Sequence, residues 1–177
     1  MRISKKNWRP LPNLLVADAG PLIALANIHR LDVPERLFQR VLVPQRVLDE
    51  CLTGGRAGSA DIARAAARKK WQVVPDVPHE LPPSLSAALG AGEAAAIALA
   101  QTRKSAMLLM DDWIGRRVAR SLGLPVIGVL GLLAAAKQRR FVLRLRPLLD
   151  QLEATGYHLS PKLIEAFLRE IGEGRKK

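Results

Sequence analysis

An α/β fold, with a parallel sheet covered by helices on both faces, is predicted by three features of the sequence. Short apolar runs alternate with longer segments of helical character along the chain. Those runs are apolar throughout rather than at every second residue, which is typical of strands buried on both faces. Only 4% of the residues are aromatic, and the abundance of Ala and Leu favours helices. With 177 residues, the chain is long enough for one domain with a sizeable core.

The first half of the chain predicts three strands, each followed or preceded by helices. The run LPNLLVAD ends in Asp18, and Pro21 suits the first turn of the helix that follows. Pro44 begins a helix directly after the second strand. The strands are expected at 11–18, 40–43 and 71–75, and the helices at 21–30, 31–38, 44–52 and 60–71, with a turn at 53–59.

The second half predicts two further strands and the helices around them. Prolines make 76–84 irregular, and the Gly-Ala-Gly break within 85–103 precedes a helix that opens at Glu93. Gly123 stops the helix after the fourth strand, and Ser160 caps the last helix. The strands are expected at 106–112 and 124–129, and the helices at 113–123, 130–141, 146–156 and 160–172.

The charge of the chain favours a polyanionic partner. Twenty-eight Lys and Arg against 16 Asp and Glu give a net charge of +12, and nucleic acid is the commonest polyanion that a protein meets. An acidic protein partner would account for the same charge. The segment 101–146 holds ten Lys or Arg and only two acids, the adjacent Asp111 and Asp112.

Neither zinc binding nor export is indicated. Cys51 is the only cysteine, so it makes no internal disulfide, and the histidines lack zinc-ligand spacing relative to it. Asp18 interrupts the apolar run that follows the basic N-terminus, which argues against an export signal. No apolar run is long enough to span a bilayer. We therefore expect a soluble, cytoplasmic protein with no membrane contact.

Five acidic residues predict a divalent-metal site. Asp18 ends the first expected strand, and Asp111 and Asp112 end the fourth, so all three belong to the carboxyl edge of the sheet, where ligands gather. Glu50 and Glu93 lie on helices near that edge. Mg²⁺ and Mn²⁺ prefer carboxylate and water oxygens, and clustered carboxylates repel one another unless a cation neutralises them. Such a site within a basic chain suits hydrolysis of phosphodiester bonds.

Each acid also has a purely structural interpretation. Asp18 and Asp112 could cap the helices that follow them, and Glu93 is favoured by the dipole of its own helix. Glu50 could be an exposed residue of an amphipathic helix.

The basic and aromatic residues can also be interpreted either as functional or as structural. Arg116 and Arg117 follow the acidic pair by one helical turn, where they could bind phosphate or form a solvated helix face. Packing in the core or in an interface, rather than base stacking, is predicted for Trp8, Trp71 and Trp113.

Five stretches within residues 13–140 resemble the PIN domain family. More closely, they are similar to its prokaryotic branch of PIN-like predicted nucleic-acid-binding proteins, which is related to the toxins of type II toxin–antitoxin pairs. In family order, the stretches are LLVADAGPLIALA, VLVPQRVLDECL, LGAGEAAAIALA, LLMDDWIGRRVARSLGLPVIG and GLLAAAKQRR.

The resemblance implies a three-layer, Rossmann-like PIN fold, whose central parallel sheet has the order 3-2-1-4-5 and is flanked by helices. It also implies a ribonuclease site that uses Mg²⁺ or Mn²⁺. We expect a PIN-like nuclease domain over 11–145, C-terminal helices over 146–172 packed on the same domain, and a disordered basic tail over 173–177.

The family's acids can be carried over by position. Asp18 matches the Asp of the first strand, Glu50 the Glu of the P-x-x-V-x-x-E helix, and Glu93 the acid of the GE-A helix. Either Asp111 or Asp112 matches the acid after the fourth strand. All five are candidate catalytic residues. The candidate metal ligands are Asp18, Glu93, Asp111 and Asp112, and the candidate nucleic-acid contacts are Arg116 and Arg117.

Two positions depart from the family pattern. Gly20 stands where many PIN domains carry Ser or Thr, and Val129 stands where relatives often have Thr. Both changes remove a hydroxyl that would support the site.

The sequence thus predicts a metal-dependent endoribonuclease, the toxin-like member of a toxin–antitoxin system. Its expected partners are RNA, an acidic antitoxin protein and a second copy of the chain, with the apolar helices 21–28 and 85–100 as the dimer interface. The alternative is a catalytically inactive PIN-fold module that binds RNA or another protein.

Overall fold

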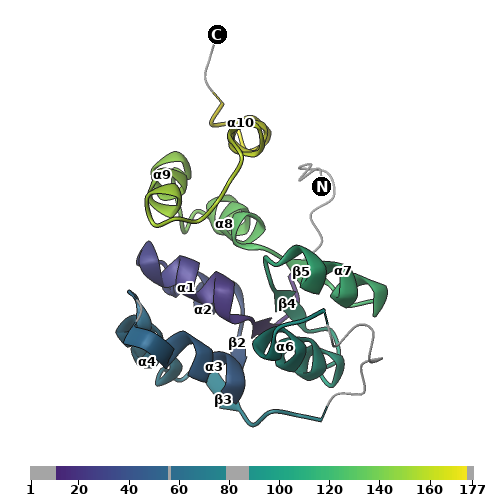
Figure 1. The fold of residues 1–177 in the computed structure, drawn as a ribbon. Helices are drawn as coiled ribbons and strands as arrows, with labels where there is room; N and C mark the ends of the chain where they lie inside the picture. Colours follow the sequence, from purple (N-terminus) through teal and green to yellow (C-terminus); the bar gives the residue numbers. More distant parts are fainter. Residues whose placement is uncertain (1–10, 56, 79–87, 175–177) are drawn as a thin grey trace.

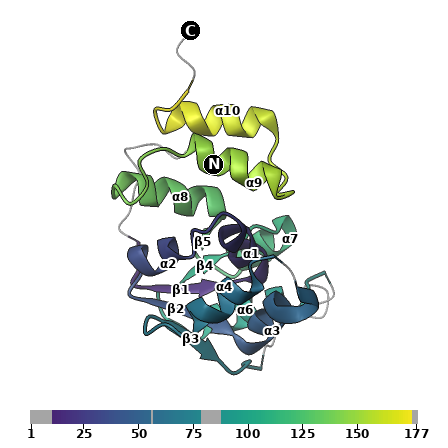
Figure 2. The same cartoon turned by 90° about the vertical axis from the view of Figure 1, so that its left-hand side faces the viewer.

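A single parallel sheet organises the residues that the computed structural model describes, which are 11–55, 57–78 and 88–174. Its five strands have the order β3-β2-β1-β4-β5, which Figure 2 shows as a stack. They are β1 (Leu14–Ala17), β2 (Arg40–Pro44), β3 (Trp71–Val74), β4 (Met107–Leu109) and β5 (Val126–Ile127). The expected parallel sheet, its strand order and the flanking helices are confirmed.

Helices connect the strands, as parallel pairing requires. Between β1 and β2 lie α1 (Ala19–Asn27) and α2 (Asp32–Leu37), and between β2 and β3 lie α3 (Gln45–Leu52), the 3₁₀ turn η1 (Thr53–Gly55) and α4 (Ser59–Ala66). The helix α6 (Ala91–Gln101) precedes β4, and α7 (Trp113–Ser121) follows it. After β5 come α8 (Val129–Gln138), α9 (Arg146–Ala154) and α10 (Pro161–Glu170).

Several boundaries differ from those predicted. The first helix begins at Ala19 rather than at residue 21, because the chain turns directly after Asp18. Pro44 is the last residue of β2 rather than the first of a helix. α6 opens at Ala91, two residues before Glu93, because the Glu93 side chain reaches back to the backbone N–H that precedes the helix. Strands β1, β4 and β5 are shorter than the apolar runs predicted for them, since only inner residues of those runs pair with a neighbouring strand.

The core fills the space between the sheet and its helices. Leu15 and Val16 in β1 and Leu108 and Leu109 in β4 are fully buried, as expected for strands covered on both faces. The lone cysteine, Cys51, is buried as well. Most apolar residues of α1 and α6 are buried within the chain itself, although Ile23 is half-buried. Residues 85–87 of the predicted dimer interface lie outside the described residues, and the dimer stays a prediction.

The tryptophans have different environments. Trp71 is buried, as predicted, and Trp8 lies outside the described residues. Trp113 is 69% exposed, which excludes packing in the core of this chain and leaves packing in an interface as a prediction.

The C-terminal helices α9 and α10 stack beyond α8 at one end of the molecule (Figures 1 and 2). Their buried residues include Leu149, Leu152 and Phe167, and Ser160 caps α10 by accepting a hydrogen bond from the Leu163 N–H, as predicted. Glu173, in the expected tail, accepts hydrogen bonds from the backbone N–H groups of Leu145 and Arg146 at the start of α9. Residues 175–177 of that tail lie outside the described residues.

Within the described ranges, no helix is long and apolar enough to cross a membrane.

Candidate active site

Strand pairing brings Asp18 to the end of β4. In the register of the two strands Ala17 lies opposite Leu109, and the Asp18 N–H donates a hydrogen bond of 3.0 Å to the Leu109 carbonyl. The carboxyl ends of β1 and β4 therefore meet at one edge of the sheet. Asp18 is only 5% exposed, and it is the one buried polar or charged residue among those the structure describes.

The electrostatic surroundings of Asp18 disfavour its charged form. The pKa of Asp18 is raised from 3.8 to about 7, chiefly by burial and in smaller part by the nearby carboxylates of Glu93 and Glu50. The backbone N–H groups of Ala19 and Gly20 act in the opposite direction. Acids from β1, α3 and α6 thus lie near enough to influence one another.

Glu93 has the same kind of environment. Burial raises the pKa of its carboxyl group, and the carboxylates of Asp112 and Glu50 add to the rise. The Gly90 N–H opposes this effect by donating a hydrogen bond of 3.0 Å to Glu93 Oε2. Glu93 therefore stabilises the start of α6, as the Glu of a capping box does, while its carboxylate remains close to the other acids.

Glu50 reaches this group from α3. Its side chain is exposed, yet its carboxylate lies against the first turn of α6, where a Cβ built on Gly92 would be 2.5 Å from Glu50 Oε2. Only a glycine at position 92 leaves that space open. The sequence did not single out this glycine, because its value depends on how two helices pack.

Asp112 completes what we call the acidic cluster: Asp18, Glu50, Glu93 and Asp112. Its Oδ2 accepts a hydrogen bond of 2.7 Å from the Gly115 N–H, so Asp112 caps α7. Its charge also raises the pKa of Glu93. The sequence left open whether Asp112 caps a helix or belongs to the acidic site. In the structure it does both.

Asp111 turns away from the acidic cluster. Burial raises the pKa of its carboxyl group, against hydrogen bonds from the Tyr157 hydroxyl and the Val129 N–H and the nearby charge of Arg116. The Val129 N–H lies 3.2 Å from Asp111 Oδ1 and 3.3 Å from Oδ2. Adjacent residues on extended backbone face opposite sides, which explains why the two neighbouring aspartates separate.

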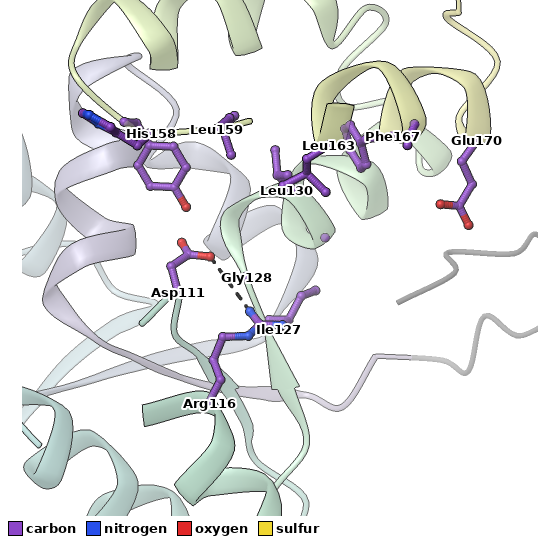
Figure 3. Close-up of a pocket in the computed structure, with 13 residues that line it drawn as sticks. Asp111, Arg116, Ile127, Gly128, Leu130, His158, Leu159, Leu163, Phe167 and Glu170 are labelled. Atoms are coloured by element: carbon purple, nitrogen blue, oxygen red, sulfur yellow. Dashed lines mark ion pairs between the residues drawn. The ribbon is translucent and has the colours of Figure 1, made fainter. Parts of the chain in front are cut away.

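The carboxylate of Asp111 thus supports the start of α8 and anchors the segment between α9 and α10. It borders a cavity of about 550 Å³ whose wall includes Leu130, Leu163 and Phe167 (Figure 3). No member of the acidic cluster lines this cavity.

Burial and Asp111 raise the pKa of Tyr157, so its hydroxyl remains a hydrogen-bond donor. Sequence reasoning missed Tyr157, because nothing in its local sequence links it to Asp111.

The two arginines also separate. Arg116 is directed inward: its Nη1 donates a hydrogen bond of 2.8 Å to the Met110 carbonyl and lies 3.9 Å from Asp111 Oδ1. Burial and Arg120 lower the pKa of Arg116. Arg117, in contrast, is exposed.

The acidic cluster fits a hard divalent cation by its chemistry, because all its donors are carboxylate oxygens. The side chains as they lie are not arranged as a finished ligand set: within the described ranges, no three Asp, Glu, His or Cys side chains form a metal-binding group. Glu93 and Asp112 each use one oxygen on a backbone N–H. Ion binding would therefore require these side chains to reorient.

The missing hydroxyl at position 20 leaves space near the cluster. A Cβ built on Gly20 would lie 3.9 Å from Asp18 Oδ2, an ordinary contact distance. A Cβ is therefore accommodated at this position, so crowding at the Cβ does not explain why the residue is glycine. Val129 is buried, and its backbone N–H serves Asp111.

Comparison with known proteins places the chain in a family. No curated protein matches it. The model of the family DUF3368, described as a PIN domain, matches residues 14–173. That match spans all five strands, the acidic cluster and both C-terminal helices. The strand order of the sheet agrees with it, and the chain belongs to the PIN domain family.

Proposed function

We propose that this protein is a divalent-metal-dependent endoribonuclease, which hydrolyses RNA phosphodiester bonds at the acidic cluster. PIN domains are typically nucleases and commonly metal-dependent. The observation that carries the proposal is that carboxylates from four separate segments converge at one edge of the sheet: those of Glu93 and Glu50 raise the pKa of the buried Asp18, and those of Asp112 and Glu50 raise the pKa of Glu93. Such repulsion destabilises a fold unless a cation neutralises it.

The roles within the cluster follow from burial and from hydrogen bonds. Asp18, Glu93 and Asp112 would hold Mg²⁺ or Mn²⁺, which activates water and offsets charge on the phosphate when it is bound. Glu50 is exposed, and its Oε2 reaches the start of α6, so it is placed to accept a proton from the attacking water. Asp111 is left out, because its carboxylate is committed to Val129 and Tyr157.

RNA is the proposed substrate because of charge. The excess of 28 Lys and Arg over 16 Asp and Glu attracts a phosphate backbone, and Arg117 is an exposed basic residue on α7, the helix that Asp112 caps. We also propose a toxin-like role, with an acidic antitoxin as partner, and self-association as a homodimer. The same positive charge supports an acidic partner.

Thermal denaturation in the presence of Mn²⁺ and an RNA-cleavage assay test the proposal together. Saturation at about 100 times the dissociation constant stabilises a protein by about 2.7 kcal/mol, which corresponds to a rise of roughly 5–10 °C in the melting temperature. Asp18→Asn should abolish both the rise and the cleavage. Glu50→Gln should reduce cleavage, whereas Asp49→Asn, the adjacent acid on the same helix, should leave it unchanged.

A melting curve that Mn²⁺ does not shift, together with intact RNA, would instead favour the inactive module that binds RNA or protein. Gly20, which lacks the hydroxyl found in many relatives, is the feature that supports this second candidate. Size-exclusion chromatography with light scattering addresses the proposed dimer separately.

A further inference from the structure

Trp113 is an aromatic side chain that the fold leaves in solvent. It is 69% exposed, and it is the only aromatic among the exposed large apolar residues of the described ranges. It is the first residue of α7 and directly follows Asp112 of the acidic cluster. Large aromatic side chains dominate the energetics of cores and interfaces, so an exposed one beside a charged cluster indicates a surface that binds something.

A basic side chain accompanies the indole ring. Arg117 lies one helical turn further along α7, with its guanidinium carbon 5.5 Å from the centroid of the Trp113 ring. That distance is within the range of cation–π attraction, which orients both groups. Ile114 is 39% exposed and Arg120 is exposed, so the solvent side of α7 combines apolar and positive character.

We propose that Trp113 and Arg117 form a stacking platform for an unpaired base of RNA, with Arg117 also contacting a neighbouring phosphate. This inference rests on the proposed function and adds a base-binding site at the start of α7. Every base offers a π-face to an aromatic ring, but only an unstacked base can expose it. The platform therefore holds an unpaired segment next to the acidic cluster and accepts any base.

Position and charge favour this occupant. Trp113 directly follows Asp112 at the start of α7, so a strand whose base stacks on Trp113 passes the end of the helix that Asp112 caps. A planar guanidinium suits both stacking on the ring and binding of phosphate. A protein partner that covers the same residues is the competing occupant, and the experiment below separates the two.

Fluorescence anisotropy with a labelled single-stranded RNA, in Mg²⁺, measures the platform. All variants carry Asp18→Asn as a common background, so the strand stays intact whether or not the proposed nuclease is active. Stacking of one base on an aromatic ring predicts that Trp113→Ala weakens binding by about tenfold. Trp113→Phe should retain most of the affinity, whereas Trp113→Leu, which is apolar without a π-face, should resemble Trp113→Ala.

An RNA strand of the same length without bases is the matched control. The platform predicts that Trp113→Ala leaves binding of this abasic strand unchanged, because the contact lies between ring and base. Arg117→Ala should lower the affinity for both strands. It should also reduce the slope of log affinity against log salt concentration by about one, as expected for the loss of one phosphate contact. Circular dichroism checks that each variant is folded, as expected for exposed positions.

Two results would overturn the platform. One is an equal effect, or no effect, of Trp113→Ala on the intact and abasic strands. The other is a Trp113→Ala variant that binds RNA normally but changes its mass in light scattering, which would assign Trp113 to a contact between copies of the chain. Because cleavage is not measured, failure of the platform and failure of the proposed nuclease give different results.

Discussion

Replacing Asp18 by Asn should stabilise the metal-free protein at alkaline pH and leave it nearly unchanged at acidic pH. Asp18 is 5% exposed, and burial is the largest cause of the rise in its pKa from 3.8 to about 7. Asn has nearly the same shape and carries no charge. The substitution therefore removes the cost of a buried carboxylate and keeps most of the packing.

The sign of the effect follows from proton binding. Between pH 4 and pH 7 the folded chain keeps Asp18 protonated, whereas the unfolded chain has released the proton, so the wild-type protein loses stability as the pH rises through this window. A shift of about three pKa units, at 1.36 kcal/mol per unit, corresponds to about 4 kcal/mol. Asp18→Asn should thus be more stable than wild type by up to about 4 kcal/mol at pH 8, or roughly 10 °C in melting temperature.

Differential scanning fluorimetry in EDTA, from pH 4.5 to pH 8.5, measures this difference directly. Asp150→Asn, an exposed acid on α9, is the matched control and should follow the wild-type curve. Saturating Mn²⁺ at pH 8 should stabilise only the chains that keep Asp18. It should therefore reduce the difference in melting temperature between Asp18→Asn and wild type. Wild-type and Asp18→Asn curves that stay parallel across the whole pH range would refute the reasoning.

Three further substitutions test separate parts of the structure. Tyr157→Phe removes the hydroxyl bonded to Asp111 and should lower the free energy of unfolding by about 1–2 kcal/mol in urea denaturation; an unchanged midpoint would mean that this hydrogen bond contributes nothing. Gly92→Ala places a Cβ 2.5 Å from Glu50 Oε2 and should displace that flexible carboxylate, so the chain still folds and responds to Mn²⁺ but cleaves RNA more slowly; undiminished cleavage would exclude Glu50 from the reaction. Leu133→Ala opens a cavity at a fully buried position and should cost about 2–5 kcal/mol, whereas Leu143→Ala, at a residue 80% exposed, should change stability by less than about 0.5 kcal/mol in the same denaturation assay.

Local patterns predict the fold well, because a buried parallel strand needs an unbroken apolar run and each crossover needs a helix. The runs around Val16 and Leu108 become β1 and β4, and the alternation with helices accounts for the parallel pairing. Strand ends are less predictable, since a residue such as Met110 is apolar and buried whether or not a neighbouring strand pairs with it. The start of α6 depends on one hydrogen bond from the Gly90 N–H to Glu93, which no periodicity reveals.

The candidate site, like the fold, was predictable from the sequence only in part. Residue types and their places at strand and helix ends identify Asp18, Glu50 and Glu93 as acids of one edge of the sheet. Periodicity cannot separate Asp111 from Asp112, because each follows the same strand. The partners that separate them, Val129 and Tyr157 on one side and Glu93 on the other, come from distant parts of the chain.

The sequence by itself determined the class of fold, the excess of positive charge and the set of acids available, since these depend on composition and on local spacing. Tertiary structure alone decided which carboxylates meet, that Arg116 turns inward and that Trp113 stays in solvent. The physical reason is that a side chain's protonation and exposure are set by groups brought close through packing, and those groups are remote along the chain.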